Sequence, residues 1–150
     1  MKMSINLEVS VIDGNLVFTG NDGGIVTFSK EQVVQKKVSM VTLGEFSNLP
    51  KIQIAKTFGY LTRKSYYDIR NAVLNGSIED LIPELTGPKS ATKRTRELEA
   101  LVIKMRFETD YNMYEIADKL RGLGFDVSSR LISQILADYG LSKKKPFKVE

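Results

Sequence analysis

The sequence predicts a mainly α-helical protein with a small N-terminal β-hairpin or meander and two tandem units of three helices, each with a helix-turn-helix. Three observations lead to this fold class. Runs of high β propensity, separated by glycine-containing turns, lie near the start of the chain. Apolar residues then recur at spacings of three and four, which marks one face of a helix. The order helix, helix, turn, helix occurs twice.

Composition limits the functions that the chain can have. Its 150 residues, 42% of them hydrophobic, suffice for one domain or two small ones. With no cysteine and no histidine, it lacks disulfides, thiolate zinc sites and the commonest general base. No apolar run reaches the roughly 18 to 20 residues of a membrane span, and "MKMSINLEVS" has no secretory signal pattern. We therefore expect a cytoplasmic protein that is not an enzyme.

The net charge of +4 is concentrated in the later part of the chain. Residues 1–50 hold four of the 22 Lys and Arg residues and five of the 18 acidic residues, so the positive excess lies after them. A basic surface favours a polyanionic partner where the cations lie on a surface built to receive one. An ordinary solvated surface explains the same count of charges. The placement of the basic residues must therefore decide between these two interpretations.

Residues 1–28 are predicted to form the β-hairpin or meander. Three runs have strand character: "INLEVSVI", "NLVFT" and "IVTF". Asp13-Gly14 between the first two is a hairpin signal, and "GNDGG" supplies a second turn. Because "GNDGG" lacks the lysine and the helix that follow a phosphate-binding loop, we interpret it as a turn alone.

The first helix-turn-helix unit is expected at residues 29–76, which contain three stretches of helical apolar spacing. Residues able to cap a helix precede each stretch. They are the capping-box pair Ser29 and Gln32, then Asn48, then Thr62. The predicted helices cover about residues 30–46, 49–57 and 63–74.

Residues 77–95 are predicted to be a basic linker with one short helical turn, since "TGPKSATKRTR" has four basic residues and no acidic one. The second helix-turn-helix unit follows at residues 96–141. Its helices are "RELEALVIKMRFE", then "MYEIADKL" capped by Asn112, then "SRLISQILADYG" capped by Ser128. Residues 142–150 are predicted to be a basic tail.

Two short helices joined by a glycine-containing turn, the second capped by Ser or Thr, form a helix-turn-helix. The first helix braces the second, whose outer face enters the major groove of DNA. In the second unit, inward placement of Ile132, Ile135, Leu136 and Tyr139 leaves polar side chains outside. Arginine can bond guanine and glutamine can bond adenine, while serine suits a base or a phosphate. The outer residues are Ser129, Arg130, Ser133 and Gln134.

In the first unit, inward placement of Tyr66, Ile69 and Val73 exposes a similar face that also includes Asp68. Cations of the linker and the tail are expected at phosphates. The candidate DNA-binding residues are therefore Arg63, Lys64, Tyr67, Asn71, Lys89, Lys93, Arg94, Arg96, Ser128, Ser129, Arg130, Ser133, Gln134, Lys143, Lys144 and Lys145.

These segments resemble the paired-type, double helix-turn-helix N-terminal region of bacterial insertion-sequence transposases. The first unit and linker, from "IAKTFGYLTRKSYYDIRNAVLNG" to "TKRT", and the second, "ELEALVIKMRFETDYNMYEIADKLRGLGFDVSSRLISQILADYGL", carry the likeness. The resemblance implies recognition of transposon-end DNA in the bacterial nucleoid. It also implies that a metal-dependent catalytic domain would lie in a longer parent protein, so this chain needs neither a cofactor nor a metal.

Other functions remain open at this point. A freestanding transcriptional regulator would use the same surfaces, and the N-terminal strand edges could make the chain a protein-interaction or homodimerisation module. A metal-dependent nuclease is a third alternative. The acid pairs Glu79-Asp80 and Glu97/Glu99 begin helices, where carboxylates favour the helix dipole, so we do not assign them a metal. Double-stranded DNA is the expected partner, with no membrane or small-molecule substrate.

Overall fold

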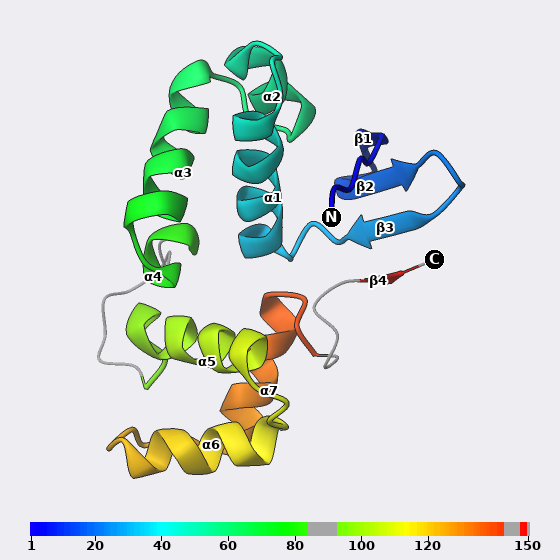
Figure 1. Ribbon diagram of the computed structural model, residues 1–150. Helices are drawn as coiled ribbons and strands as arrows, with labels where there is room; N and C mark the ends of the chain where they lie inside the picture. The colour runs from blue at the N-terminus through cyan, green and yellow to red at the C-terminus, as the bar shows by residue number, and fades with distance from the viewer. Residues whose placement is uncertain (84–92, 143–147, 150) are drawn as a thin grey trace. The chain divides into compact units, whose positions relative to one another are not determined.

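Seven helices and four strands form the described part of the chain, and the predicted class of a mainly helical protein with a small sheet is confirmed (Figure 1). The computed structural model describes residues 1–83, 93–142 and 148–149. They divide into unit 1, residues 1–75 with 148–149, and unit 2, residues 76–83 with 93–142. Among the described helices, none has the length and apolar character needed to cross a membrane.

The sheet of unit 1 is antiparallel with the strand order β1-β2-β3-β4. Its first turn has Asp13 at φ 53° and Gly14 at φ 79°, so both central residues adopt the left-handed backbone that a type I′ hairpin requires. This confirms the predicted hairpin signal. The strands are β1 (Leu7–Ile12), β2 (Asn15–Gly20), β3 (Ile25–Phe28) and β4 (Lys148–Val149).

Strand β4 was not predicted, because residues 142–150 were assigned to a basic tail. Val149 pairs with Val26 and Lys148 with Thr27, so the end of the chain covers the outer edge of β3. Two residues are too few to show an alternating pattern, and their partner lies at the other end of the sequence. Strand β1 remains at the open edge of the sheet.

One face of the sheet packs into the core of unit 1. Leu16 and Phe18 lie on the same face of β2, since alternate residues of a strand share a face. Phe18 meets Phe28 edge to face at a centroid distance of 5.7 Å, and it reaches Phe58 at 6.5 Å. The buried residues of this core are Leu16, Met40, Ile54, Ala55, Phe58 and Tyr66.

Three helices supply the rest of unit 1, and two of their predicted starts are corrected. The first begins at Val33 instead of residue 30, although Ser29 N–H does donate to Gln32 Oε1 at 2.9 Å. Asn48 does not cap the second helix, because Pro50, with its fixed φ of −57°, occupies the N-cap position. The helices are α1 (Val33–Phe46), α2 (Lys51–Thr57) and α3 (Arg63–Asn75).

Unit 2 contains four helices whose caps include the two that were predicted. Asn112 accepts the amides of Tyr114 and Glu115 at 3.0 and 2.9 Å, and Ser128 Oγ accepts Leu131 N–H at 3.2 Å. The helices are α4 (Ile78–Leu81), α5 (Arg96–Glu108), α6 (Met113–Gly122) and α7 (Ser129–Asp138). Their fully buried side chains include Leu98, Val102, Ile103, Ile116, Ala117, Leu120, Ile132 and Ile135.

Part of the predicted linker packs within unit 2. Leu81 and Ile82 are buried, at 5% and 3% exposure, and Arg96 Nη2 donates to the carbonyl of Glu79 at 2.6 Å. This bond fastens α4 to the start of α5. Residues 84–92, the rest of the basic stretch, lie outside the described residues.

Helices α2 and α6 end in the same type of turn. Gly59 after α2 and Gly124 after α6 have φ of +87° and +97°, which only glycine adopts readily. The paired bonds of a Schellman motif close both helices. They are Gly59 N to Lys56 O, Tyr60 N to Ala55 O, Gly124 N to Arg121 O and Phe125 N to Leu120 O, at 2.9 to 3.0 Å.

Substitution of Gly44 tests the packing of α1 against α3. A Cβ added there would lie 2.5 Å from both Cε2 and Oη of the buried Tyr66. Overpacking costs about 1–3 kcal/mol, whereas alanine in a helix gains at most about 1 kcal/mol over glycine. Gly44→Ala should therefore lower the melting temperature measured by calorimetry. Gly122→Ala, at a helical glycine with nothing within 4 Å, should not lower it; equal losses in both variants would contradict this account.

Candidate nucleic-acid interface

Helix α7 separates its buried and exposed faces as predicted. Ile132 and Ile135 are fully buried, Leu136 is 2% exposed, and Arg130 and Ser133 are exposed. Gln134 is exposed on the same side, with Ser128 at the cap and Ser129 half-buried. The helix therefore presents a guanidinium, an amide and hydroxyls to solvent, all of which can bond the edges of bases.

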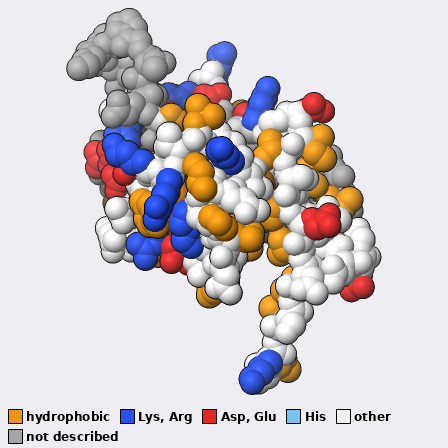
Figure 2. Space-filling view, turned by 90° about the horizontal axis from the view of Figure 1, so that it is seen from above, with side chains coloured by type: hydrophobic (Ala, Val, Ile, Leu, Met, Phe, Trp, Pro, Cys, Tyr) orange, Lys and Arg blue, Asp and Glu red, His pale blue; other side chains and the backbone are white. Residues whose placement is uncertain are grey.

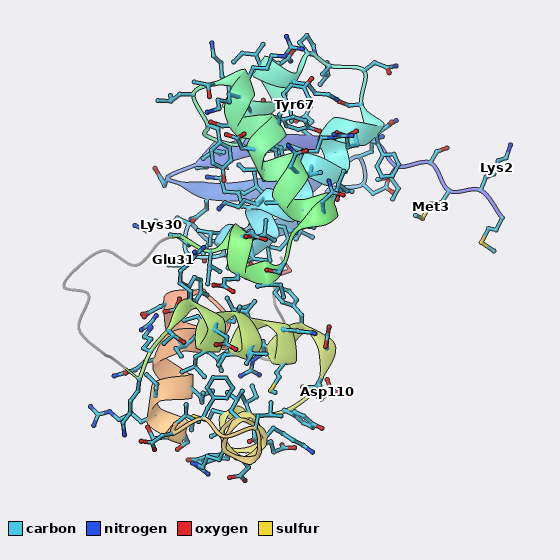
Figure 3. The ribbon with its side chains drawn as sticks, turned by 90° about the vertical axis from the view of Figure 1, so that its left-hand side faces the viewer. Lys2, Met3, Lys30, Glu31, Tyr67 and Asp110 are labelled. Atoms are coloured by element: carbon cyan, nitrogen blue, oxygen red, sulfur yellow. The ribbon has the colours of Figure 1, made fainter. Side chains whose placement is uncertain are left out.

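Helix α3 has a corresponding face, on which Arg63, Lys64, Tyr67, Asp68 and Asn71 are exposed. The Arg63 guanidinium lies 5.5 Å from the centroid of the Tyr67 ring, and its Nη2 donates to the tyrosine hydroxyl at 3.4 Å. Tyr67 is on the helix in front in Figure 3. The Asp68 carboxylate adds a negative charge, so this face is less positive than that of α7.

The cap fixes the place of each exposed side chain. Thr62 Oγ1 accepts Ser65 N–H at 3.2 Å, as Ser128 does at the start of α7. Counted from these caps, Lys64 takes the place of Arg130, and Tyr67 takes that of Ser133. In Figure 2, Lys and Arg side chains gather beside exposed hydrophobic side chains on the face that carries α2 and α3.

Arg94 was predicted to contact phosphate, and the structure gives it a different position. Its Nε donates to Oε1 of Glu99 at 2.5 Å, and its Nη1 pairs with Asp138 at 2.6 Å. The Glu99 side chain is fully buried, and its second oxygen accepts the hydroxyl of Tyr139. Arg94 therefore neutralises a buried carboxylate, and we remove it from the candidate interface.

This cluster changes the acidity of its members. Burial raises the pKa of Tyr139, and its hydrogen bond to Glu99 adds to the effect. Burial acts to lower the pKa of Arg94, but the hydrogen bonds to Glu99 and Asp138 outweigh it, so the net shift is upward. Both groups therefore keep their protons at any pH near neutrality.

Unit 1 has a cluster of the same chemistry. Oε1 of Glu45 on α1 accepts the hydroxyl of Tyr66 at 2.8 Å and Nε of Arg70 at 2.5 Å, both donors being on α3. The hydrogen bond from Tyr66 is the main cause that lowers the pKa of Glu45, and burial raises the pKa of Tyr66. A carboxylate thus ties α1 to α3 in unit 1 and α5 to the end of α7 in unit 2.

The other predicted phosphate contacts divide into three groups. Arg96 is half-buried and bonded to the backbone beside α4, so it is structural. Lys93 pairs with Asp126 at 2.6 Å, but both side chains are largely exposed, and water or phosphate can replace either partner. Lys89, Lys143, Lys144 and Lys145 lie outside the described residues.

Sequence reasoning missed Arg106, which lies on the buried stripe of α5 and is 6% exposed. Its Nη1 donates to the carbonyl of Tyr111 at 3.4 Å, while its Nε is buried without an acceptor. The sequence did contain a signal for it, because Arg106 follows Leu98 and Val102 at the helical spacing of four and so falls on the apolar face. A charge placed on a buried face needs a partner.

Neither a metal site nor a relative adds to these observations. Among the residues that the structure describes, no group of three or more acidic side chains could hold a metal ion. Comparison with protein-family models, with curated proteins and with solved structures found no match.

Substitution of Arg94 separates its structural role from a role in DNA contact. Arg94→Ala should destabilise unit 2 by about 3 kcal/mol, because it leaves the buried Glu99 without its cation. Lys93→Ala, which removes an exposed ion pair, should leave the melting temperature unchanged. Chemical denaturation of both variants gives the comparison. An Arg94→Ala protein as stable as the parent would return this residue to the candidate interface.

Proposed function

We propose that the chain binds double-stranded DNA in a sequence-specific manner, with α3 and α7 acting as the reading helices of two helix-turn-helix units. The observation that carries the proposal is the matched outer faces of these helices. Lys64 and Arg130 occupy the same place after their caps, as do Tyr67 and Ser133. Exposed cationic and hydrogen-bonding side chains at the start of a helix are what major-groove readout needs.

The preceding helices support this reading geometry. Ala55 in α2 and Ala117 in α6 are fully buried, and a small side chain allows close packing against the next helix. The glycine turns then redirect the chain within a few residues to the caps of α3 and α7. In a helix-turn-helix this arrangement leaves the start of the reading helix free to enter the groove.

Transposon-end recognition is the more specific form of the proposal, and it is supported by the resemblance to transposase N-terminal regions. A freestanding transcriptional regulator would use the same two helices. Selection of bound duplexes from a random pool tests the shared proposal, because two reading helices should select a site with two separated half-sites. Absence of any enriched sequence would exclude sequence-specific binding.

Arg130→Ala should weaken binding to the selected site by about 1–3 kcal/mol and relax the preference at one base position, as expected for a lost bidentate arginine contact. Lys64→Ala is the matched variant in the other unit and should relax a different position. Repeating the selection with each variant measures both effects. Equal loss of affinity on selected and random duplexes would show that Arg130 does not read a base.

Affinity should fall steeply with salt, because the cations near the reading helices would displace counterions from phosphates. With ~6 phosphate contacts, the log–log slope should be about −5, a loss of roughly a thousandfold between 50 and 200 mM salt. Lys93→Ala should make the slope shallower by about one without affecting folding. Fluorescence anisotropy at a series of salt concentrations measures the slope, and a flat response would rule out DNA binding.

A further inference from the structure

A pocket of about 300 Å³ lies between the start of α6 and the adjoining face of α7. The pocket lies next to the turn between α5 and α6. Asp110, which belongs to this turn, is labelled in Figure 3. Apolar atoms make up most of its lining surface, and the buried Arg106 is among its lining residues. The residues that line it are Arg106, Asn112, Met113, Tyr114, Ser133, Leu136 and Ser142.

Arg106 differs from Arg94, a half-buried arginine of unit 2. Arg94 has two carboxylate partners, whereas within the described ranges no carboxylate forms an ion pair with Arg106. Its guanidinium donates one long bond, to the carbonyl of Tyr111, and its Nε has no acceptor. Burial correspondingly lowers the pKa of Arg106. A buried charge in this state is costly unless an anion pairs with it.

The pocket supplies further features that favour an anion. It contains Asn112 and the first residues of α6, where the helix dipole gives a positive potential, although the Asn112 side chain already accepts the amides of Tyr114 and Glu115. Ser133 also lines the pocket, and its hydroxyl can donate a hydrogen bond. The Glu115 carboxylate accepts the backbone N–H of Asn112 at 3.4 Å. This side chain is exposed and does not line the pocket.

From this combination we infer that the pocket is an oxyanion site that takes a phosphate group. Arg106 is the charge partner, the Ser133 hydroxyl is a hydrogen-bond donor, and the dipole of α6 adds a positive potential. The phosphate can belong to a nucleic-acid backbone or to free inorganic phosphate. In the first case the inference rests on the proposed function, and Ser133 contacts the backbone instead of a base. A phosphate fixed there would hold α7 in register on the duplex.

Arg106→Met tests the site, because it keeps an unbranched side chain that suits the apolar stripe and removes the charge. Without phosphate the variant should melt at the same temperature as the parent or higher, since an unpaired buried charge is replaced by an apolar group. With inorganic phosphate the parent should gain stability and the variant should not. Lys104→Met, at an exposed cation of the same helix, controls for general salt effects and should respond as the parent does.

NMR of the full chain identifies the residue that responds. Inorganic phosphate should shift the Arg106 Nε–H resonance of the parent saturably, and Ser133→Ala should weaken the apparent affinity severalfold. A parent protein with no saturable shift, or an Arg106→Met variant that still gains stability from phosphate, would overturn the inference.

DNA titrations identify the source of the phosphate. If the site takes a backbone phosphate, Arg106→Met weakens binding to all duplexes and makes the log–log salt slope shallower by about 0.9. An unchanged slope with a retained phosphate response assigns the site to free phosphate. A parent that responds to phosphate but binds no duplex would refute the proposed function and leave the oxyanion site in place.

Discussion

Each unit depends on one carboxylate that ties together two helices separated by a third, α1 and α3 in unit 1 and α5 and α7 in unit 2. Glu99 of α5 holds Arg94 and Tyr139, which lie at opposite ends of the three-helix segment. Glu45 of α1 holds Tyr66 and Arg70 of α3. Apolar packing alone tolerates small rotations of a helix, whereas a carboxylate with two directional donors does not. The rotation of α3 and of α7, and hence the outer face of each helix, is therefore set by these bonds.

Local signals allowed most of the helices and strands to be predicted. Caps such as Thr62 and Ser128, and turns such as Asp13-Gly14, act through neighbouring residues and can be recognised without tertiary information. Likewise, helical spacing was enough to separate Ile132 from Arg130. These features define the elements and the outer faces that form the candidate site.

What the sequence did not indicate is pairing between distant residues. Tyr139 bonds Glu99 across 40 positions, and the short strand β4 pairs with a strand at the other end of the chain. A positive residue in a basic stretch looks the same whether it will contact phosphate or neutralise a buried acid. The sequence assigned Arg94 to phosphate for this reason, since only the fold brings it to Glu99.

The described cations consequently fall into two classes that composition cannot separate. Arg94 pairs with the buried Glu99 and Arg70 with the exposed Glu45, while Arg130 and Lys64 are exposed on helices whose rotation those carboxylates fix. Arg106 belongs to neither class, because it is buried and lacks an acid. A hydrophobic residue would fill its place at lower cost in stability. A charge kept where folding alone does not favour it is better explained by a ligand than by packing.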